Sequence, residues 1–366
     1  MRILAIDVGT GTQDILLFDS EQPVENALQL IMPSPTKIAE GRIRRATEAQ
    51  RAVLVTGVNS GGGPCQWALE DHLRAGLKAY ATREAATTFD DDLDNVEQMG
   101  VTLVSDDEAK SVEADHVPLR DLDLDAIRTA LAAFDVSGEF DGLALGCLDH
   151  GAAPPDYSDR LFRFDHMREV AGGRNDLLAF AYTPGELPDY LTRARTLVDS
   201  ADSEAPIVFM DTGPAAALGA LQDPIVGERK EQTVLNLGNM HALAFHLRRT
   251  QIVSLYEHHT GEVTAEQIED FTDRLIAGAL PHDDVFNSKG HGVYYADYVE
   301  PEGKGEPWVA VTGPQRGKLR DSRLNPYFAV PHGDMMVSGC FGLLWAFAEK
   351  HPEQSEAILT SLGVNP

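Results

Sequence analysis

Short apolar runs bounded by turn residues alternate along the chain with amphipathic stretches, and this pattern predicts an α/β fold. The first apolar run breaks on a glycine–threonine turn and then resumes, which predicts a β-hairpin made of residues 3–8 and 14–19. The same strand–glycine turn–strand pattern returns at 232–247. Further strands are expected at 52–58, 140–151, the start of 206–221 and 308–319, and helices after residue 63 and at 160–171, 186–201, 264–280 and 333–350.

The length of 366 residues exceeds the usual size of a single core, so we expect two α/β units. An N-terminal unit is assigned to 1–205 and a C-terminal unit to 206–366, with a boundary across which the units can interleave. Residues 86–126 are rich in acidic side chains and match no motif. They form an acid-rich insertion in the N-terminal unit, within which FDDDLDNVEQMG (89–100) is expected to be a solvated loop and helix.

The formal charge of −28 limits the partners of the chain. A nucleic-acid backbone would be repelled over most of the surface, whereas a nucleotide needs only local N–H groups and a metal ion. No apolar run approaches the length of a membrane span, and the short N-terminal run does not resemble a secretory signal. Three scattered cysteines fit a reducing compartment. The expected location is the cytoplasm, with no nucleic-acid or membrane partner and an open oligomeric state.

Asp7 and the turn that follows it form a candidate phosphate loop. Gly9 and Gly11 lie on either side of Thr10, and Thr12 follows, so backbone N–H groups can point into one concavity while the hydroxyls add donors. Asp7, at the strand end, would hold a hydrated Mg²⁺ that offsets the phosphate charge. A plain hairpin turn tolerates the same residues, so this stretch alone leaves both interpretations open.

Several segments resemble, in order and character, the motifs of the actin-like ATPase superfamily, which includes actin, heat-shock chaperones and sugar kinases. They are IDVGTGTQDILLFD for the first phosphate motif, MDTGPAAALGAL for the connecting helix, VLNLGNMHALAFHL for the second phosphate hairpin and VAVTGPQRGKL for the adenosine motif. GDMMVSGCFGLLWAF occupies the position of the final connecting helix. The resemblance implies a two-lobed α/β fold of ribonuclease H-like type, with a nucleotide cleft between the lobes.

The resemblance also implies which residues would bind ATP and Mg²⁺. The residues that would contact the nucleotide are Gly9, Thr10, Gly11 and Thr12 in the first hairpin, Gly238 and Asn239 in the second, and Thr312 and Gly313 near the adenosine. Asp7 would position the Mg²⁺ ion.

Several positions depart from the superfamily pattern. Asn236 stands where the second hairpin usually has aspartate, and Asn239, Met240 and His241 stand where Gly-Gly-Thr is usual. Pro314 replaces the second glycine of the adenosine motif. Acetate-kinase-like members tolerate a Leu-Gly-Asn turn, so phosphate contact does not depend on the usual sequence. The departures are compatible with nucleotide binding and altered hydrolysis, or with a degenerate nucleotide site.

The combination of AIDVGTGTQDILLFD and MDTGPAAALGAL resembles a family that carries the label "pyruvate formate-lyase activating enzyme". A radical activating enzyme needs three closely spaced cysteines to hold an iron–sulfur cluster. Cys65, Cys147 and Cys340 are too far apart in the sequence to supply that local motif. We therefore do not expect the chemistry that the label names.

Two strand ends carry further candidate catalytic aspartates. Asp149 and His150 lie just past a predicted strand end, where α/β proteins present ligand-binding groups and an aspartate can orient the attacking hydroxyl or water. The alternative is a helix-capping aspartate beside a surface histidine. Asp211, at the next strand end, could position a metal or water. The triplet Asp-Thr-Gly at 211–213 mimics an aspartic protease, but such enzymes need a second carboxylate and the chain has one such triplet.

A glycine-rich turn and a set of histidines can each be interpreted either as a binding site or as an ordinary structural feature. The glycine-rich turn VNSGGGP precedes a predicted helix and could bind an acidic ligand or simply be a tight turn. Histidines gather in the C-terminal half and could bind a transition metal, although no pair has a recognisable ligand spacing and loop histidines are the default. These histidines are His258, His259, His282, His291 and His332.

Three classes of function follow from the sequence. The first is an ATP-dependent enzyme, either an ATPase or a small-molecule kinase, with Mg²⁺ and a base such as Asp149 or Asp211. The second is an ATP-gated activator with little turnover that acts on a partner enzyme. The third is a nucleotide-free descendant that binds another ligand between the lobes.

Overall fold

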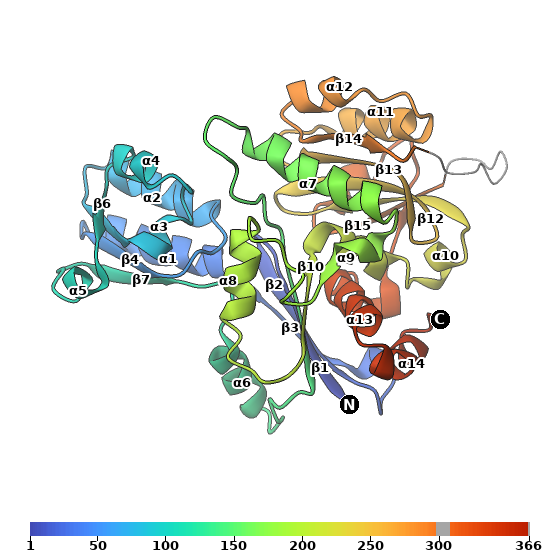
Figure 1. The fold of residues 1–366 in the computed structure, drawn as a ribbon, viewed down its shortest axis with the longest axis horizontal. Helices are drawn as coiled ribbons and strands as arrows, with labels where there is room; N and C mark the ends of the chain where they lie inside the picture. Colours follow the sequence, from blue (N-terminus) through green and yellow to red (C-terminus); the bar gives the residue numbers. More distant parts are fainter. Residues whose placement is uncertain (298–307, 365–366) are drawn as a thin grey trace.

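The fold is described here from a computed structural model, which covers residues 1–297 and 308–364. Two six-stranded sheets form the body of the molecule, and a four-stranded sheet with its own helices stands to one side of it (Figure 1). In the part of the chain that the structure describes, no helix combines the length and apolarity needed to cross a membrane.

The first sheet has the strand order β3-β2-β1-β8-β10-β9. Its strands are β1 (Arg2–Val8), β2 (Thr12–Asp19), β3 (Leu28–Pro33), β8 (Gly142–Cys147), β9 (Ala181–Tyr182) and β10 (Ile207–Asp211). Strands β1, β2 and β3 form an antiparallel meander, whereas β8 and β10 run parallel to β1. The predicted N-terminal hairpin is confirmed, and its buried apolar residues explain why β1 is central.

The second sheet repeats this arrangement, with the order β14-β13-β12-β11-β15-β16. Its strands are β11 (Glu231–Leu237), β12 (His241–Arg248), β13 (Gln251–His259), β14 (Gly292–Tyr295), β15 (Val309–Thr312) and β16 (Tyr327–Phe328). Strands β11, β12 and β13 form the meander, and β15 and β16 continue in parallel from β11. Five strands of each sheet share the same order and directions, and the sixth strand lies at opposite edges, as β9 and β14. Two sheets of this kind are the two-lobed actin-like architecture that the sequence predicted.

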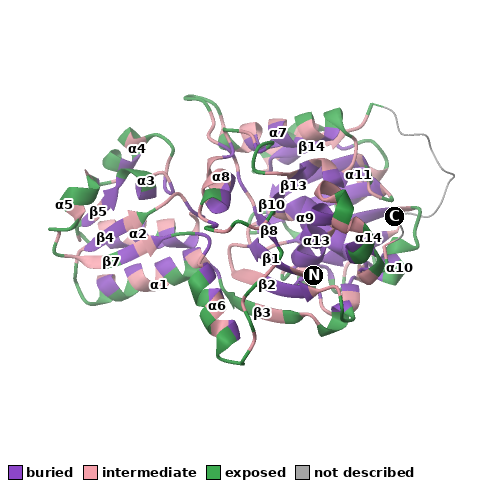
Figure 2. Cartoon of the chain, turned by 60° about the horizontal axis from the view of Figure 1, so that its bottom comes forward, coloured by how far each residue is buried: buried purple, intermediate pink, exposed green. Residues whose placement is uncertain are grey.

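Two small-residue helices lie between the sheets, α9 (Thr212–Ala220) and α13 (Ser338–Lys350). Both are almost fully buried (Figure 2). Their backbones touch because glycines stand at the crossing: a Cβ at Gly219 would overlap the carbonyl of Ser338, and one at Gly342 would overlap the carbonyl of Ala215. The alanine- and glycine-rich sequence of these helices therefore sets how closely the two lobes pack.

The four-stranded sheet belongs to a domain inserted between β3 and β8. Its parallel strands, in the order β6-β5-β4-β7, are β4 (Val53–Gly57), β5 (Ala79–Thr82), β6 (Val101–Val104) and β7 (Asp115–Leu119). The helices are α1 (Pro35–Glu48), α2 (Pro64–Arg74), α3 (Arg83–Ala86), α4 (Leu93–Gln98) and α5 (Asp106–Ala109). The inserted domain has its own apolar core.

The loop and helix expected at 89–100 are present, the helix being α4, and the rest of the acid-rich segment 86–126 contains two strands that no motif in the sequence indicated. This segment contributes β6 and β7, the two outer strands of the inserted sheet, and Val101, Val117 and Leu119 are buried in its core. Acidic residues dominate the composition because they lie at the surface and in the short helices, while only a few apolar residues are needed on strands of four or five residues.

The remaining helices are α6 (Leu124–Ala132), α7 (Asp159–Gly173), α8 (Thr192–Asp199), α10 (Pro224–Gly227), α11 (Ala265–Ile276), α12 (His282–Asn287) and α14 (Pro352–Ser361), with 3₁₀ turns at Val24–Asn26, Leu177–Phe180, Arg316–Leu319 and Pro331–Gly333. Of these helices, α6 and α8 pack on the outer face of the first sheet and α11 and α12 on that of the second, whereas α7, α10 and α14 add apolar residues to the core between the sheets. The expected helix at 186–201 is shorter, and the closing helix begins at Ser338 and is followed by α14.

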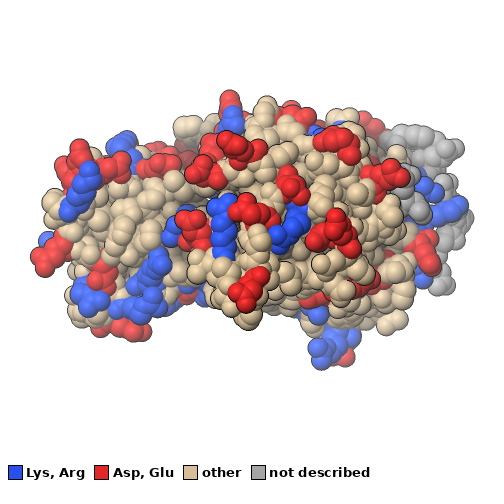
Figure 3. Space-filling model, turned by 90° about the horizontal axis from the view of Figure 1, so that it is seen from below, with Lys and Arg blue, Asp and Glu red and all other residues tan. Residues whose placement is uncertain are grey.

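The lobes interleave along the chain. Strand β10 (Ile207–Asp211) follows residue 205 but pairs with β8 in the first sheet, so the first lobe does not end at the boundary expected from the sequence. Helix α13, near the C-terminus, packs on β1, β8 and β10 of the first sheet. Figure 3 shows acidic and basic side chains spread together over one face of the molecule.

Candidate functional site

The two glycine hairpins contain the same backbone turn. The N–H of Gly9 donates to the carbonyl of Thr12 (3.0 Å), and the N–H of Gly238 donates to the carbonyl of His241 (2.9 Å). In both loops a Cβ on the glycine would lie 2.9 Å from that same carbonyl oxygen. Any side chain there would strain the turn, so each lobe needs glycine at this position.

The two hairpin loops face each other across a cleft between the lobes. Most of the residues predicted to bind a nucleotide line it, namely Asp7, Gly9, Thr10, Thr12, Gly238, Asn239, Thr312 and Gly313. Gly11 does not line the cleft; it lies against Asn239, whose amide a Cβ at Gly11 would overlap. The cleft has a volume of about 110 Å³, room for several water molecules.

Asp7 projects from the end of β1 into this cleft. Its Oδ1 accepts a hydrogen bond from the Thr212 hydroxyl (2.7 Å), and burial raises the pKa of the carboxyl to about 6. Gly339 on α13 leaves the room that the carboxylate occupies, because a Cβ there would overlap Asp7 Oδ2. Asp7, the first candidate residue of the phosphate loop, is thus held in place by both connecting helices, α9 and α13.

Asp14 is a second acid of the cleft that the sequence analysis missed. It lies directly opposite Asp7 in the β1–β2 register. Its Oδ1 is buried with no hydrogen-bond partner, and burial together with the charge of Asp7 raises its pKa to about 8. The signal was present in the sequence, since a hairpin that turns at residues 9–11 sets Asp14 across from Asp7.

The donor set fits a magnesium ion. Mg²⁺ prefers carboxylate oxygens and keeps several waters, and the cleft offers two facing carboxylates, one with an unpartnered oxygen. A bound cation would also offset the repulsion between Asp7 and Asp14. The residues of this chain that would hold Mg²⁺ are therefore these two aspartates.

The strand β15 ends at the opposite wall of the cleft, in the predicted adenosine motif. Gly313 has φ +92°, and a Cβ there would lie 2.5 Å from the carbonyl oxygen of Leu237 and 2.8 Å from Asn236 Oδ1. The Thr312 hydroxyl is buried and donates to Ser338 Oγ (3.3 Å). Asn236, the unusual residue of the second hairpin, thus packs against the glycine turn.

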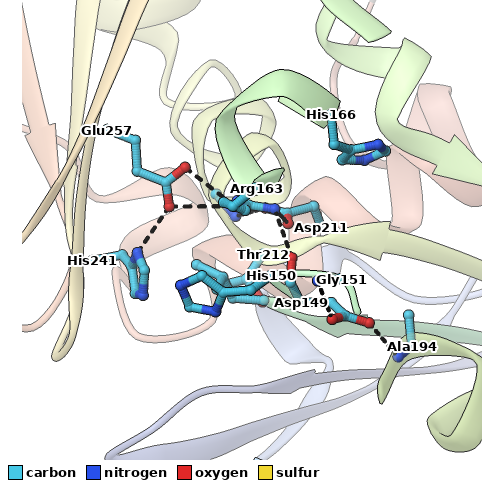
Figure 4. A network of polar contacts seen from close by, with 12 residues as sticks. Asp149, His150, Gly151, Arg163, His166, Ala194, Asp211, Thr212, His241 and Glu257 are labelled. Carbon is cyan, nitrogen blue, oxygen red and sulfur yellow. Dashed lines mark hydrogen bonds and ion pairs between the residues drawn. The ribbon is translucent and has the colours of Figure 1, made fainter. Parts of the chain in front are cut away.

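Asp149 and Asp211 belong to the polar network of Figure 4. Asp149 Oδ1 accepts from the N–H of Gly151 (2.8 Å) and Oδ2 from the N–H of Ala194 (2.9 Å), the arrangement of a capping residue. Asp211 accepts from the N–H of Gly213 (2.9 Å) and forms an ion pair with Arg163. Neither lines the narrow cleft, and their catalytic roles stay predictions.

Arg163 connects the two lobes at the base of the site. It extends from α7, with 1% of its side chain exposed, and pairs with Asp211 at the end of β10 and with Glu257 on β13 (3.2 Å). It also donates to the carbonyl of Asp149 (3.2 Å). Burial alone would raise the pKa of Glu257, but Arg163 and nearby histidines hold it well below its usual range.

A group of histidines lies beside this ion-pair network. His241 starts β12 and faces His259 at the end of β13, with ring centroids 4.9 Å apart. His291, just before β14, is fully buried, and His150 reaches the group from the first lobe. Their rings lie 4.6 to 5.6 Å from one another. Burial lowers the pKa of His150 and His291 well below normal, so these rings are neutral.

The sequence analysis recognised only part of this group. It named His259 and His291 among five candidates, and the other three lie elsewhere: His258 contacts Ser288, His282 contacts Arg168, and His332 contacts Gln222. His241 was noted only as a departure from a motif, and His150 only as a neighbour of Asp149. The members come from four separate segments, which no spacing rule in the sequence could join.

A second, wider hollow of about 1150 Å³ opens beside the narrow cleft. It lies between the inserted domain and the body, and the glycine-rich turn before α2 lines it together with Asp149, His150 and His259. The two spaces share lining residues, including Thr10, Arg193 and His241. Arg193 donates to Asp121 (2.7 Å) and to the carbonyl of Leu148 (2.7 Å), so a cation is fixed where the spaces meet.

Residues 60–318 match the family model described as "Putative pyruvate format-lyase activating enzyme (DUF1786)". The chain belongs to this family. A cluster held by cysteine thiolates would need three of them together, whereas Cys65, Cys147 and Cys340 lie buried on α2, β8 and α13. Among residues 1–297 and 308–364, the group of side chains close enough together to hold a metal ion consists of three histidines, His150, His241 and His291.

Several solved structures are similar to the chain. A ROK hexokinase from Thermus thermophilus shares 12% identity, with a TM-score of 0.24, over 69% of this chain and 48% of the hexokinase. The ethanolamine utilization protein EutJ from Carboxydothermus hydrogenoformans shares 11% identity over 94% and 89%, with a TM-score of 0.28. An exopolyphosphatase from Cytophaga hutchinsonii shares 10% over 100% and 99%, with a TM-score of 0.30. No curated protein matches the sequence. The fold assignment rests on the strand order of the two sheets.

Proposed function

We propose that this protein is a Mg²⁺-dependent, ATP-binding enzyme of actin-like type that hydrolyses ATP or transfers its terminal phosphoryl group to a small molecule. The observation that carries the proposal is the pair of identical glycine turns facing each other beside Asp7 and Asp14. Backbone N–H groups in such turns bind phosphate oxygens, and facing carboxylates suit the accompanying cation.

The residues of the cleft would divide the work as follows. Thr10 and Thr12 donate hydroxyl hydrogen bonds to phosphate from the first lobe, and the backbone of Gly238 and the amide of Asn239 contact it from the second. Mg²⁺ at Asp7 and Asp14 would neutralise phosphate charge. Because Gly11 touches Asn239, the lobes must move apart for the nucleotide to enter and close again around it.

The wide hollow is the candidate binding site of the phosphoryl acceptor. It adjoins the narrow cleft at Thr10, Arg193 and His241, so an acceptor there would lie next to the terminal phosphate. Arg193 is suited to orienting and stabilising the transferred group, because it is a fixed cation at that junction. Hydrolysis takes the place of transfer when water enters the hollow instead.

One observation favours a second candidate function, an ATP-gated activator of a partner enzyme with little turnover. Asn236 stands where aspartate is usual in the second hairpin, and this cleft-lining side chain packs against the Gly313 turn and carries no charge. Binding would then drive movement of the lobes without efficient hydrolysis.

Calorimetric titration with ATP and Mg²⁺ tests the proposal on the wild type, Asp7→Ala and Gly238→Trp. Asp19→Ala is the matched control, because Asp19 lies at the far end of the same hairpin, opposite Arg2. We expect binding by the wild type and the control and its loss in both cleft variants. Phosphate release then separates the enzyme from the activator. Absence of binding at millimolar ATP would refute both and leave a cleft for another ligand.

A further inference from the structure

Three histidines from separate segments meet between the lobes, and their ring nitrogens form a set of converging ligand atoms. His150 comes from the first lobe, after β8, whereas His241 and His291 come from the second sheet. One nitrogen of each lies within 4.8 Å of the others. Neutral imidazole is the form that ligates metals. His241 and His291 are buried, and His150 is half-buried.

The spacing of these nitrogens matches a metal centre. Zinc–imidazole bonds of about 2.0–2.1 Å in a tetrahedron separate two ligand nitrogens by about 3.3 Å. Nε2 of His291 lies 3.4 Å from Nε2 of His150. The third nitrogen needs to approach by up to about 1.5 Å, a side-chain adjustment, since the outer limit for the group is 4.8 Å.

The surroundings of the group are those that metal-bound histidines have. Nδ1 of His241 hydrogen-bonds Glu257 Oε1 (2.8 Å), which leaves Nε2 as the free nitrogen. A carboxylate on the far nitrogen of a ligating histidine fixes its orientation and raises its basicity. Glu257 is itself held by Arg163.

We propose that His150, His241 and His291 bind one divalent transition-metal ion, with zinc as the preferred ion, and that this ion joins the two lobes. Glu257 acts as the positioning residue of His241. His150 and His241 line the wide hollow, so an open coordination position can face a ligand there. The site is separate from the Asp7–Asp14 pair, and its presence does not depend on nucleotide binding.

The test is metal binding by the full chain, produced without a polyhistidine tag. Chelator-treated protein is titrated with Zn²⁺ in competition with a chromophoric chelator, and metal content is measured after dialysis. Co²⁺ supplies a second readout, the visible absorption of a tetrahedral site. The variants are His150→Ala and His291→Ala. His246→Gln is the control, a buried histidine on the same strand as His241 whose ring contacts Thr233 and Glu231.

We expect about one Zn²⁺ per chain in the wild type and the control, and at least a 100-fold loss of affinity in both alanine variants. Zn²⁺ should also raise the melting temperature of the wild type and of the control, but not that of the two alanine variants. His150 lies in a loop, so His150→Ala decides the test if His291→Ala does not fold. Substoichiometric binding by the wild type, or full binding by His150→Ala, would overturn the proposal whatever the result with ATP.

Discussion

Replacing Arg163 by methionine tests how the two lobes are joined at the base of the site. Arg163 is the shared partner of Asp211 and Glu257, which lie on different sheets and are 5% and 0% exposed. Solvent cannot screen charges that are this deeply buried. Removing one partner of a buried ion pair costs about 3–5 kcal/mol, because the remaining charges lose their compensation. We expect a loss of this size.

The pH dependence of the free energy of unfolding is a second, independent test of the role of Arg163. In the wild type the pKa of Glu257 is held below its usual range, so its contribution to stability is present above the normal pKa and is lost as pH falls. Without Arg163, burial would raise that pKa, and stability would instead rise as pH falls from 8 to 5. The slope is about 1.4 kcal/mol per pH unit for each proton taken up.

Urea denaturation followed by tryptophan fluorescence measures both effects. Arg168→Met is the matched control on the same helix, because Arg168 pairs with Asp165 at an exposed position and its removal costs at most about 1 kcal/mol. Adding Glu257→Gln and Asp211→Asn to Arg163→Met should recover most of the loss. A loss below about 1 kcal/mol, or an unchanged pH slope, would refute the role given to this ion-pair network.

Three further predictions concern close packing. Gly339→Ala should displace the Asp7 carboxylate and reduce Mg²⁺-dependent ATP binding at least 10-fold, whereas Gly173→Ala, with no atom near its Cβ, should not; titration calorimetry checks this. Gly342→Ala should push α13 away from the backbone of Ala215 and lower stability by about 3 kcal/mol or more in urea denaturation. The three cysteines are buried with raised thiol pKa values, so a thiol reagent should modify none in the folded protein and all three in urea.

The sequence predicted the repeated sheet architecture because its strongest signals are local. A strand, a glycine turn and a second strand stand next to each other in both hairpins, and the register follows from the turn. Of the inserted sheet only β4 was predicted, at 52–58; β5, β6 and β7 were missed, since strands as short as β6 (Val101–Val104) offer few positions for a pattern and lie among acidic residues. Periodicity needs longer segments to be recognised.

The site was predicted only where its residues are contiguous. The phosphate-loop residues lie together in the sequence and line one cleft. Asp14 was missed because the register of a hairpin has to be applied to find it. His150, His241 and His291 meet only once both lobes are assembled, so their proximity depends on tertiary packing that no spacing records.

The shared turn geometry of the hairpins allows a position-by-position comparison of the two halves. With Gly9 matched to Gly238, Asp7 corresponds to Asn236, Asp14 to Leu243 and Thr12 to His241. One half therefore supplies oxygen ligands to the cleft, and the other supplies an amide and an imidazole. The two lobes thus share one backbone arrangement but present different side chains to the cleft. Substitutions can change the chemistry of either lobe while the backbone that aligns the two hairpins stays the same.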